Sequence, residues 1–281
     1  MGIFVVVISL FAVVFLVAVI YSKDALAPVQ EAQEKTETTP KKEYKTINEV
    51  QLKADIGQIL SNNSDLDIGV SIIDVRTAKQ YTYGVDVPFI AASVGKILSA
   101  CFLLDQVESG KYSLEQQIGN NTARVQIQKM IGQSDNEAWH AINDELGHPA
   151  LQEYAASVGV QNYDADKNTV TPSSVAVLLN KLYSEQLLNQ DNTSFLLANM
   201  QTDLEEIQFI RKYIDPATSV YHKAGWLDDR AHDTAIIENG DRPYVLVIFT
   251  KKRFGDYDFT VGQKIFEELT IKTDTVLKAV L

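Results

Sequence analysis

Apolar residues along the chain alternate between helical and strand spacing after residue 46. Residues 47–60 carry apolar side chains at helical spacing, and the turn-forming run Asn62-Asn63-Ser64 follows them. Residues 68–75 are rich in β-branched side chains, and residues 80–85 alternate between apolar and polar. These two segments therefore predict a β-hairpin.

A block of helical patterns follows the hairpin, and a second group of strand patterns follows the helices. The predicted helices cover residues 96–108, 125–131, 136–146, 150–158 and 173–183, the last with Pro172 at its start. The remaining segments predict strands over residues 219–224, 234–238 and 244–250 and a final helix over residues 261–280. This order predicts an α+β fold: a five-stranded, mostly antiparallel sheet flanked by helices, with an inserted all-helical lobe.

The N-terminal segment has a different pattern. Every residue from Ile3 to Ile20 is apolar except Ser9, and as a helix this run would be about 27 Å long, close to the roughly 30 Å core of a bilayer. A charged region ahead of the run is missing, so residues 1–21 are interpreted as a transmembrane anchor, and a cleaved signal peptide is the alternative. Residues 22–46 are rich in Glu, Lys, Thr and Pro and predict a disordered linker, which leaves residues 47–281 as the folded domain.

Composition excludes some classes of partner. A formal net charge of −12 argues against nucleic acid as a ligand. The single cysteine, Cys101, lies within an apolar run and is expected to be a small core residue. The four histidines are scattered and form no cluster with cysteine, so no metal or cofactor is expected.

Three short stretches combine residue types that suit acyl transfer. They are Ser93-Val94-Gly95-Lys96, Ser134-Asp135-Asn136 and Lys223-Ala224-Gly225. A three-residue step at the start of a helix places Ser93 and Lys96 on one face, next to free backbone N–H groups. A lysine with its ordinary pKa of about 10.4 is a poor base at neutral pH, so Lys96 needs burial or a nearby cation such as Lys223.

The three stretches, in this order, resemble the S-x-x-K, S-D-N and K-T-G motifs of the penicillin-recognising serine enzymes. The order of helices and strands over nearly all of residues 47–281 resembles the fold of class A β-lactamases. The resemblance implies a serine acyl-enzyme hydrolase without a cofactor, acting on β-lactams or on D-Ala-D-Ala-type peptides. Because peptidoglycan and β-lactams lie outside the cytoplasmic membrane, it also implies an anchored, extracytoplasmic domain. A true β-lactamase and a binding protein without turnover are the alternatives.

The resemblance also implies a role for each motif residue. Ser93 would attack the substrate, Lys96 would take its proton, and Ser134 with Lys223 would protonate the leaving nitrogen. For substrate binding, Asn136 would hold the acyl amide, Gly225 would permit close backbone approach, and the N–H groups of Ser93 and Trp226 would form an oxyanion hole. Asp135 would be a structural anchor for its loop.

Two features depart from the family pattern. Ala224 stands where the family has a hydroxyl residue that helps to bind a substrate carboxylate, which implies weaker or altered recognition. The loop between Val160 and Pro172 lacks the Glu that activates the deacylating water in class A β-lactamases, and its carboxylates are Asp164 and Asp166.

Three basic residues near the third motif are candidates to compensate for Ala224. They are His222, Arg230 and His232. The simpler expectation for each is a solvated charge.

Overall fold

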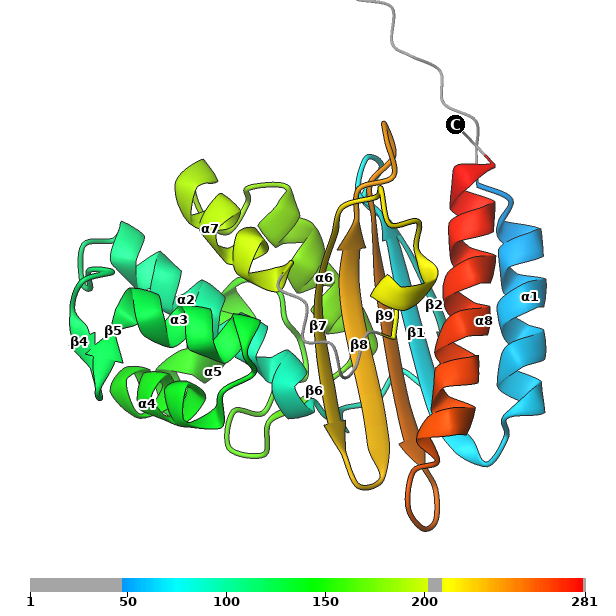
Figure 1. Ribbon diagram of the computed structural model, residues 1–281, viewed down its shortest axis with the longest axis horizontal. Coiled ribbons are helices and arrows are strands. Elements are labelled where there is room, and N and C mark those ends of the chain that lie inside the picture. The colour runs from blue at the N-terminus through cyan, green and yellow to red at the C-terminus, as the bar shows by residue number, and fades with distance from the viewer. Residues whose placement is uncertain (1–46, 202–208, 280–281) are drawn as a thin grey trace, which may run out of the picture. The chain divides into compact units, whose positions relative to one another are not determined.

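The computed structural model describes residues 47–201 and 209–279. A five-stranded antiparallel sheet with strand order β2-β1-β9-β8-β7 forms its centre (Figure 1), so the predicted sheet is confirmed. Because β1 and β9 are neighbours, both ends of the folded domain contribute to the middle of the sheet. The strands are β1 (Leu66–Asp74), β2 (Lys79–Gly84), β7 (Val220–Leu227), β8 (Arg230–Ile237) and β9 (Tyr244–Lys252).

Helices cover both faces of the sheet. The first and last helices, α1 (Glu49–Asn62) and α8 (Phe259–Lys278), pack against each other on one face (Figure 1). Helix α6 (Pro172–Tyr183) packs on β1 and β9 from the other side and begins at Pro172, as predicted. The predicted helical lobe is confirmed, with α2 (Lys96–Glu108), α3 (Ala123–Gly132), α4 (Asn136–Leu146), α5 (His148–Ser157) and α7 (Gln190–Met200). Helix α7 was absent from the sequence prediction.

Several short elements connect these layers and also escape sequence prediction. A 3₁₀ helix, η1 (Ala92–Gly95), leads directly into α2, and a second, η2 (Arg211–Tyr213), precedes β7. Two-residue strands form two small ladders: β3 (Phe89–Ile90) with β6 (Thr169–Val170), and β4 (Gln117–Ile118) with β5 (Asn121–Thr122).

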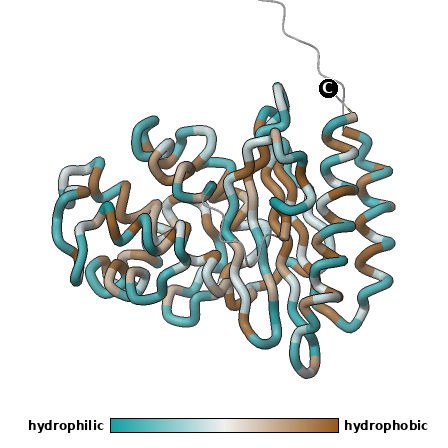
Figure 2. Tube along the Cα trace, viewed as in Figure 1, coloured by the Kyte–Doolittle hydropathy of each residue, from teal (hydrophilic) through white to brown (hydrophobic). Residues whose placement is uncertain are grey.

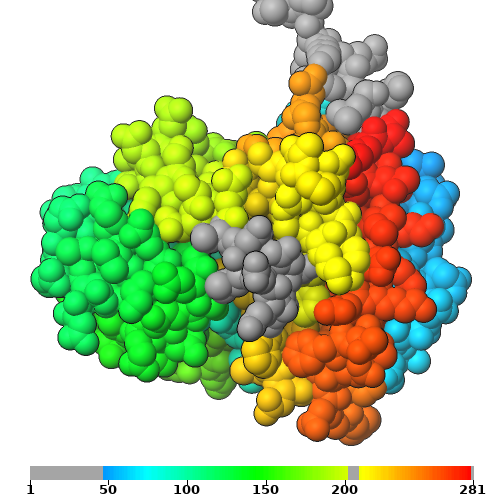
Figure 3. Space-filling view, in the orientation of Figure 1, coloured from blue at the N-terminus to red at the C-terminus, as the bar shows by residue number. Residues whose placement is uncertain are grey.

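The core lies on both sides of the sheet. Strand β9 is buried on both faces: Val247 and Phe249 pack towards the helical lobe, and Leu246 and Ile248 pack towards α1 and α8. Figure 2 shows the resulting concentration of hydrophobic residues along the central strands, and Figure 3 shows the side chains of the helical lobe, in green, beside those of the sheet and α8, in yellow to red. Cys101 is fully buried, which confirms its structural role, and burial raises the pKa of its thiol to about 12.

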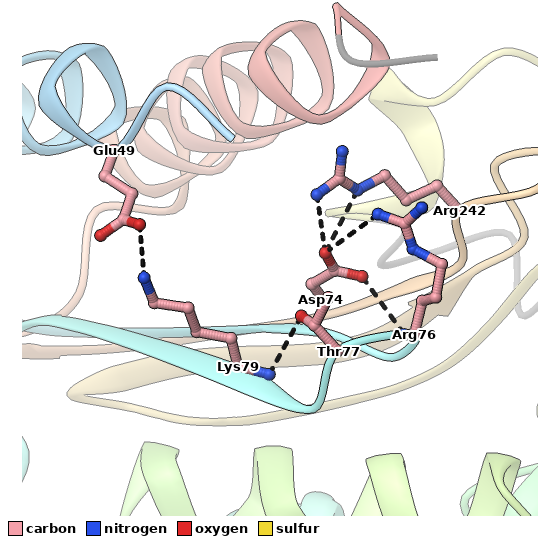
Figure 4. Close-up of polar contacts among 6 residues, drawn as sticks. All are labelled: Glu49, Asp74, Arg76, Thr77, Lys79 and Arg242. Atoms are coloured by element: carbon pink, nitrogen blue, oxygen red, sulfur yellow. Dashed lines mark hydrogen bonds and ion pairs between the residues drawn. The ribbon is translucent and has the colours of Figure 1, made fainter. Parts of the chain in front are cut away.

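A buried ion pair fixes one end of the sheet. Asp74, the last residue of β1, is 1% exposed and accepts hydrogen bonds from Arg242 at 2.7 and 3.2 Å (Figure 4). Arg76 lies 3.7 Å from the same carboxylate. On the surface nearby, Lys79 contacts Glu49 (Figure 4). The Asp74–Arg242 pair therefore joins the end of β1 to the turn before β9.

Removing Asp74 takes away a buried carboxylate that accepts two hydrogen bonds from Arg242 and lies 3.7 Å from Arg76. Asp74→Ala is expected to lower the free energy of unfolding by about 3–5 kcal/mol, measured by urea denaturation. Glu49→Gln breaks the neighbouring exposed pair and should leave the unfolding midpoint nearly unchanged. Equal losses in the two variants would contradict this assignment.

Within residues 47–201 and 209–279, no helix is long and apolar enough to cross a membrane. The predicted anchor and linker lie outside the described residues.

Candidate active site

The first motif lies where η1 passes into α2. Ala92 adopts a positive φ of 49°, which turns the chain sharply just before Ser93. Lys96 begins α2, and its Nζ lies 2.9 Å from Ser93 Oγ. The two side chains therefore meet, as the three-residue spacing predicts.

The second motif is the turn between α3 and α4. Asp135 caps α4 by accepting a hydrogen bond from the N–H of Ala138 at 3.0 Å, and it forms an ion pair with Lys129 at 3.1 Å. These contacts confirm the structural role predicted for Asp135. Ser134 has a positive φ of 56°, and its carbonyl oxygen accepts a hydrogen bond from Lys96 Nζ at 2.7 Å. The strained turn thus brings the second motif onto the first.

The hydrogen bonds of Lys96 specify where its lone pair can point. The nitrogen donates to Ser134 O and to Asn136 Oδ1, both at 2.7 Å, and the nearer of its two hydroxyl partners is Ser93 Oγ at 2.9 Å, with Ser134 Oγ at 3.4 Å. A carbonyl oxygen can only accept, whereas a hydroxyl can also donate. A neutral amine with two N–H groups therefore satisfies both carbonyls and directs its lone pair at the hydroxyl of Ser93.

Burial makes this neutral form accessible. Lys96 is fully buried, and desolvation together with the positive charge of Lys223 lowers its pKa from 10.5 to about 7. Both causes expected from the sequence are present, and desolvation is the larger. Trp139 adds to the enclosure, with its ring centroid 5.4 Å from Lys96 Nζ.

Lys223 extends the network from the edge strand β7. Its Nζ donates to Ser134 Oγ at 3.0 Å and to the carbonyl oxygen of Ala224 at 3.2 Å. Burial lowers its pKa to about 8, and the nearby Asp233 opposes this shift. Ser134 Oγ also lies 3.4 Å from Lys96 Nζ, so this hydroxyl lies between the two amines and can exchange a proton with either.

Gly225 permits the close approach that the sequence predicts. A Cβ atom at this position would lie 2.7 Å from the backbone nitrogen of Ser93 and 3.0 Å from the carbonyl oxygen of Ala91. Any larger residue would push β7 away from η1. The next residue, Trp226, is half exposed, and its ring meets that of Phe259 edge-on at 5.8 Å.

None of the three basic residues near this strand is the solvated charge expected from the sequence. The side chain of His222 is 9% exposed and lies 3.4 Å from Asp233. His232 is fully buried, its ring stacks on Phe249, and desolvation lowers its pKa to about 4. Its neutral Nε2–H donates to the carbonyl oxygen of Ile90 at 3.0 Å, just ahead of η1. Arg230 is also buried and pairs with Asp229 at 2.6 Å. Neither side chain replaces the missing hydroxyl at position 224.

The loop between Val160 and Pro172 is tied to η1 by Asn168. The side-chain NH₂ group of Asn168 donates to the carbonyl oxygen of Ala92 at 2.9 Å. The backbone carbonyl oxygen of Asn168 accepts a hydrogen bond from the N–H of Ala91 at 2.8 Å. This segment therefore supports the strained turn before Ser93, a structural role that sequence reasoning missed.

Both carboxylates of the loop are engaged elsewhere. Asp164 contacts Lys167 Nζ at 2.7 Å, and this bond holds the pKa of the Asp164 carboxyl below its usual value. Asp166 lies 2.8 Å from Nδ1 of His148 on α5. Asp164 is thus a weakened base, and Asp166 is directed towards α5.

This chain resembles a known protein family and several solved structures. The model of the β-lactamase enzyme family matches residues 51–270. The chain belongs to this family. Similar solved structures include β-lactamases from Chitinophaga pinensis (TM-score 0.72, 18% identity, covering 79% of this chain and 97% of that one) and Xanthomonas campestris (TM-score 0.73, 18% identity, 80% and 97%). A third is an ancestral class A β-lactamase (TM-score 0.72, 20% identity, 80% and 99%). These likenesses establish the class A β-lactamase-like fold.

The two lowered lysine pKa values predict a narrow pH optimum for acylation of Ser93. Labelling by a fluorescent penicillin should accelerate as pH rises through about 7, where Lys96 loses its proton, and should slow above about 8, where Lys223 loses its own. Lys223→Arg keeps the positive charge at all these pH values and should remove the falling limb. Stopped-flow or quench labelling from pH 5.5 to 9.5 measures the profile, and a flat profile would contradict these roles.

Proposed function

We propose that the protein is a serine acyl-enzyme hydrolase that acts on D-Ala-D-Ala-type peptides or on β-lactams. The observation that carries this proposal is the hydrogen-bond set of Lys96, which directs its lone pair at Ser93, together with the burial that lowers the pKa of Lys96 to about 7. A lysine with a purely structural role would require neither a lone pair directed at a serine hydroxyl nor a lowered pKa. Membership in the β-lactamase enzyme family supports the same reaction class.

The geometry supports a sequence of proton transfers. Ser93 Oγ attacks the acyl carbon as its proton passes to Lys96 Nζ, 2.9 Å away. The oxyanion that forms is stabilised by the N–H groups of Ser93 and Trp226, each worth about 3–4 kcal/mol in comparable enzymes. Ser134 then gives its proton to the leaving nitrogen and is resupplied from the lysines beside it. Asn136 keeps its amide N–H groups for the acyl chain, because its oxygen accepts from Lys96.

The residues present support the second half of the reaction, hydrolysis of the acyl-enzyme, less well than the first. This difference favours a penicillin-binding enzyme over a true β-lactamase. Hydrolysis of the acyl-enzyme needs a base that activates water, and a general base contributes about 10²–10⁴-fold. Asp164 and Asp166 are paired with Lys167 and His148. The acyl-enzyme is therefore expected to be long-lived. A β-lactamase with another deacylation route is the second candidate, supported by the fold.

The central prediction is a covalent adduct on Ser93. Wild-type protein incubated with a penicillin should gain the mass of the intact drug, and peptide mapping should place it on Ser93. Ser93→Ala should reduce labelling by about 10³-fold or more, because it removes the hydroxyl nearest to Lys96 Nζ, and the other hydroxyl beside this nitrogen, that of Ser134, lies 3.4 Å away and accepts a hydrogen bond from Lys223. Ser157→Ala, on α5, should label like the wild type. An adduct that persists on Ser93→Ala would remove the assignment.

The lifetime of the same adduct decides between the two candidate enzymes. After removal of free penicillin, the label should decay slowly, and a chromogenic cephalosporin should give a burst of about one product per enzyme before a slow phase. Fast turnover without a burst would favour the true β-lactamase. Failure of every β-lactam and peptide probe to label an intact protein would favour the binding protein without turnover.

We further propose that the domain lies outside the cytoplasmic membrane and is anchored by residues 1–21. The support is the uninterrupted apolar run from Ile3 to Ile20 and the extracytoplasmic location of the substrates of this reaction class. Protease added to intact cells is expected to release the domain by cutting within residues 22–46. A mature protein that begins near Pro28 would show a cleaved signal peptide instead.

A further inference from the structure

The indole ring of Trp139, on α4, contacts the amine of Lys96. The centroid of the ring lies 5.4 Å from Lys96 Nζ, and Lys96 is fully buried. Trp139 itself is only partly buried, and Asn136, one turn earlier on α4, is exposed. Trp139 therefore lies at the boundary between solvent and the buried amine.

A chain of hydrogen bonds fixes the orientation of the indole. Trp139 Nε1 donates to Ser99 Oγ at 3.0 Å, and Ser99 Oγ donates to Asn143 Oδ1 at 2.8 Å. Ser99 lies one turn after Lys96 on α2, so two hydrogen bonds join α2 to α4: Lys96 to Asn136 and Trp139 to Ser99. Ser99 is fully buried, and an indole N–H can only donate, so this hydroxyl favours one orientation of the ring.

The indole has two opposite effects on the proton affinity of Lys96. A π face attracts an ammonium and favours the protonated amine, whereas exclusion of water disfavours it. The distance of 5.4 Å is close to the upper limit of about 6 Å for the first effect. Burial is the largest cause of the lowered pKa of Lys96, ahead of the charge of Lys223, and Asp135 opposes both. Exclusion of water is therefore the stronger effect of the ring.

We propose that Trp139, oriented by Ser99, is a positioning residue that shields Lys96 from water and so keeps this amine available as the base for Ser93 at neutral pH. A tryptophan with a purely structural role would fill the space between α2 and α4 without changing the proton affinity of Lys96. This inference rests on the proposed acylation of Ser93 and adds a residue that acts through its base.

Acylation rates at two pH values separate this role from a structural one. Trp139→Ala admits water to Lys96 and should raise its pKa. The maximal rate of Ser93 acylation by a fluorescent penicillin is measured by stopped flow at saturating reagent on the full-length protein. Relative to wild type, this rate should fall about tenfold at pH 6 and only about twofold at pH 8, because wild-type Lys96 is mostly protonated at pH 6 and mostly neutral at pH 8. Lys223 is the same in both proteins, so its own titration cancels in the comparison. A structural defect alone would lower both rates by the same factor.

Two further variants and a control define the contact. Trp139→Phe keeps an aromatic cover and should lose about twofold to threefold of the rate at pH 6 and none at pH 8. Ser99→Ala removes the acceptor of the indole N–H and should also lower the rate more at pH 6 than at pH 8. The ring of His140 stacks on Trp139 at 5.9 Å, so this titratable group also lies beside the indole. His140→Ala should keep the wild-type ratio of the two rates, and a changed ratio would assign the pH dependence to His140 instead.

A direct titration of Lys96 tests the inference without acylation, and it remains available where Trp139→Ala does not fold. In full-length protein labelled with carbon-13 at the lysine ε-carbons, the Lys96 resonance is identified by its loss in Lys96→Arg. This resonance should titrate at higher pH in Trp139→Phe than in the wild type. An unchanged titration, or equal losses of acylation at both pH values in the folded variants, overturns the role of Trp139. If wild-type protein never labels on Ser93, the proposed function fails, whereas the titration still decides whether the indole sets the proton affinity of Lys96.

Discussion

The site depends on one costly arrangement, a lysine side chain removed from water and held by oxygen atoms on three sides. Burial of the Lys96 ammonium is unfavourable, and the protein relieves this cost by letting the group lose its proton near neutral pH. Ser134 O and Asn136 Oδ1 fix the neutral amine, and Ser93 takes the direction that remains. Every other element of the site serves to assemble these atoms.

Assembly requires parts of the chain that are far apart in sequence. Helix α2 supplies Lys96, the turn before α4 supplies Ser134, and β7 supplies Lys223. The three meet because Gly225 lets the edge strand approach the backbone of Ser93, while strained backbone at Ala92 and Ser134 aims the groups that follow. Strain of this kind persists only where the surrounding structure enforces it. The helical lobe and the sheet therefore act as two rigid supports for one small polar cluster.

Periodicity and local motifs were enough to predict the sheet, the long helices and the meeting of Ser93 with Lys96. They could not reveal α7, whose start depends on Asn189 as its cap and whose apolar residues are few. They also could not place His232 and Arg230, because a basic residue in a strand gives no sign of its partners.

The residues of this site divide unevenly between the two halves of acyl transfer. Those that we propose to form the acyl-enzyme are linked by hydrogen bonds of 2.7–3.0 Å around Lys96 and Lys223. In the loop that would serve deacylation, the polar side chains stabilise the local structure instead. Asn168 supports the turn before Ser93, and Asp164 is bound to Lys167. A base committed to an ion pair is less able to take a proton from water, because protonation would break the pair. Neither carboxylate of this loop is placed beside a water as Lys96 is placed beside Ser93, and this difference is the physical reason to expect the proposed acyl-enzyme to accumulate.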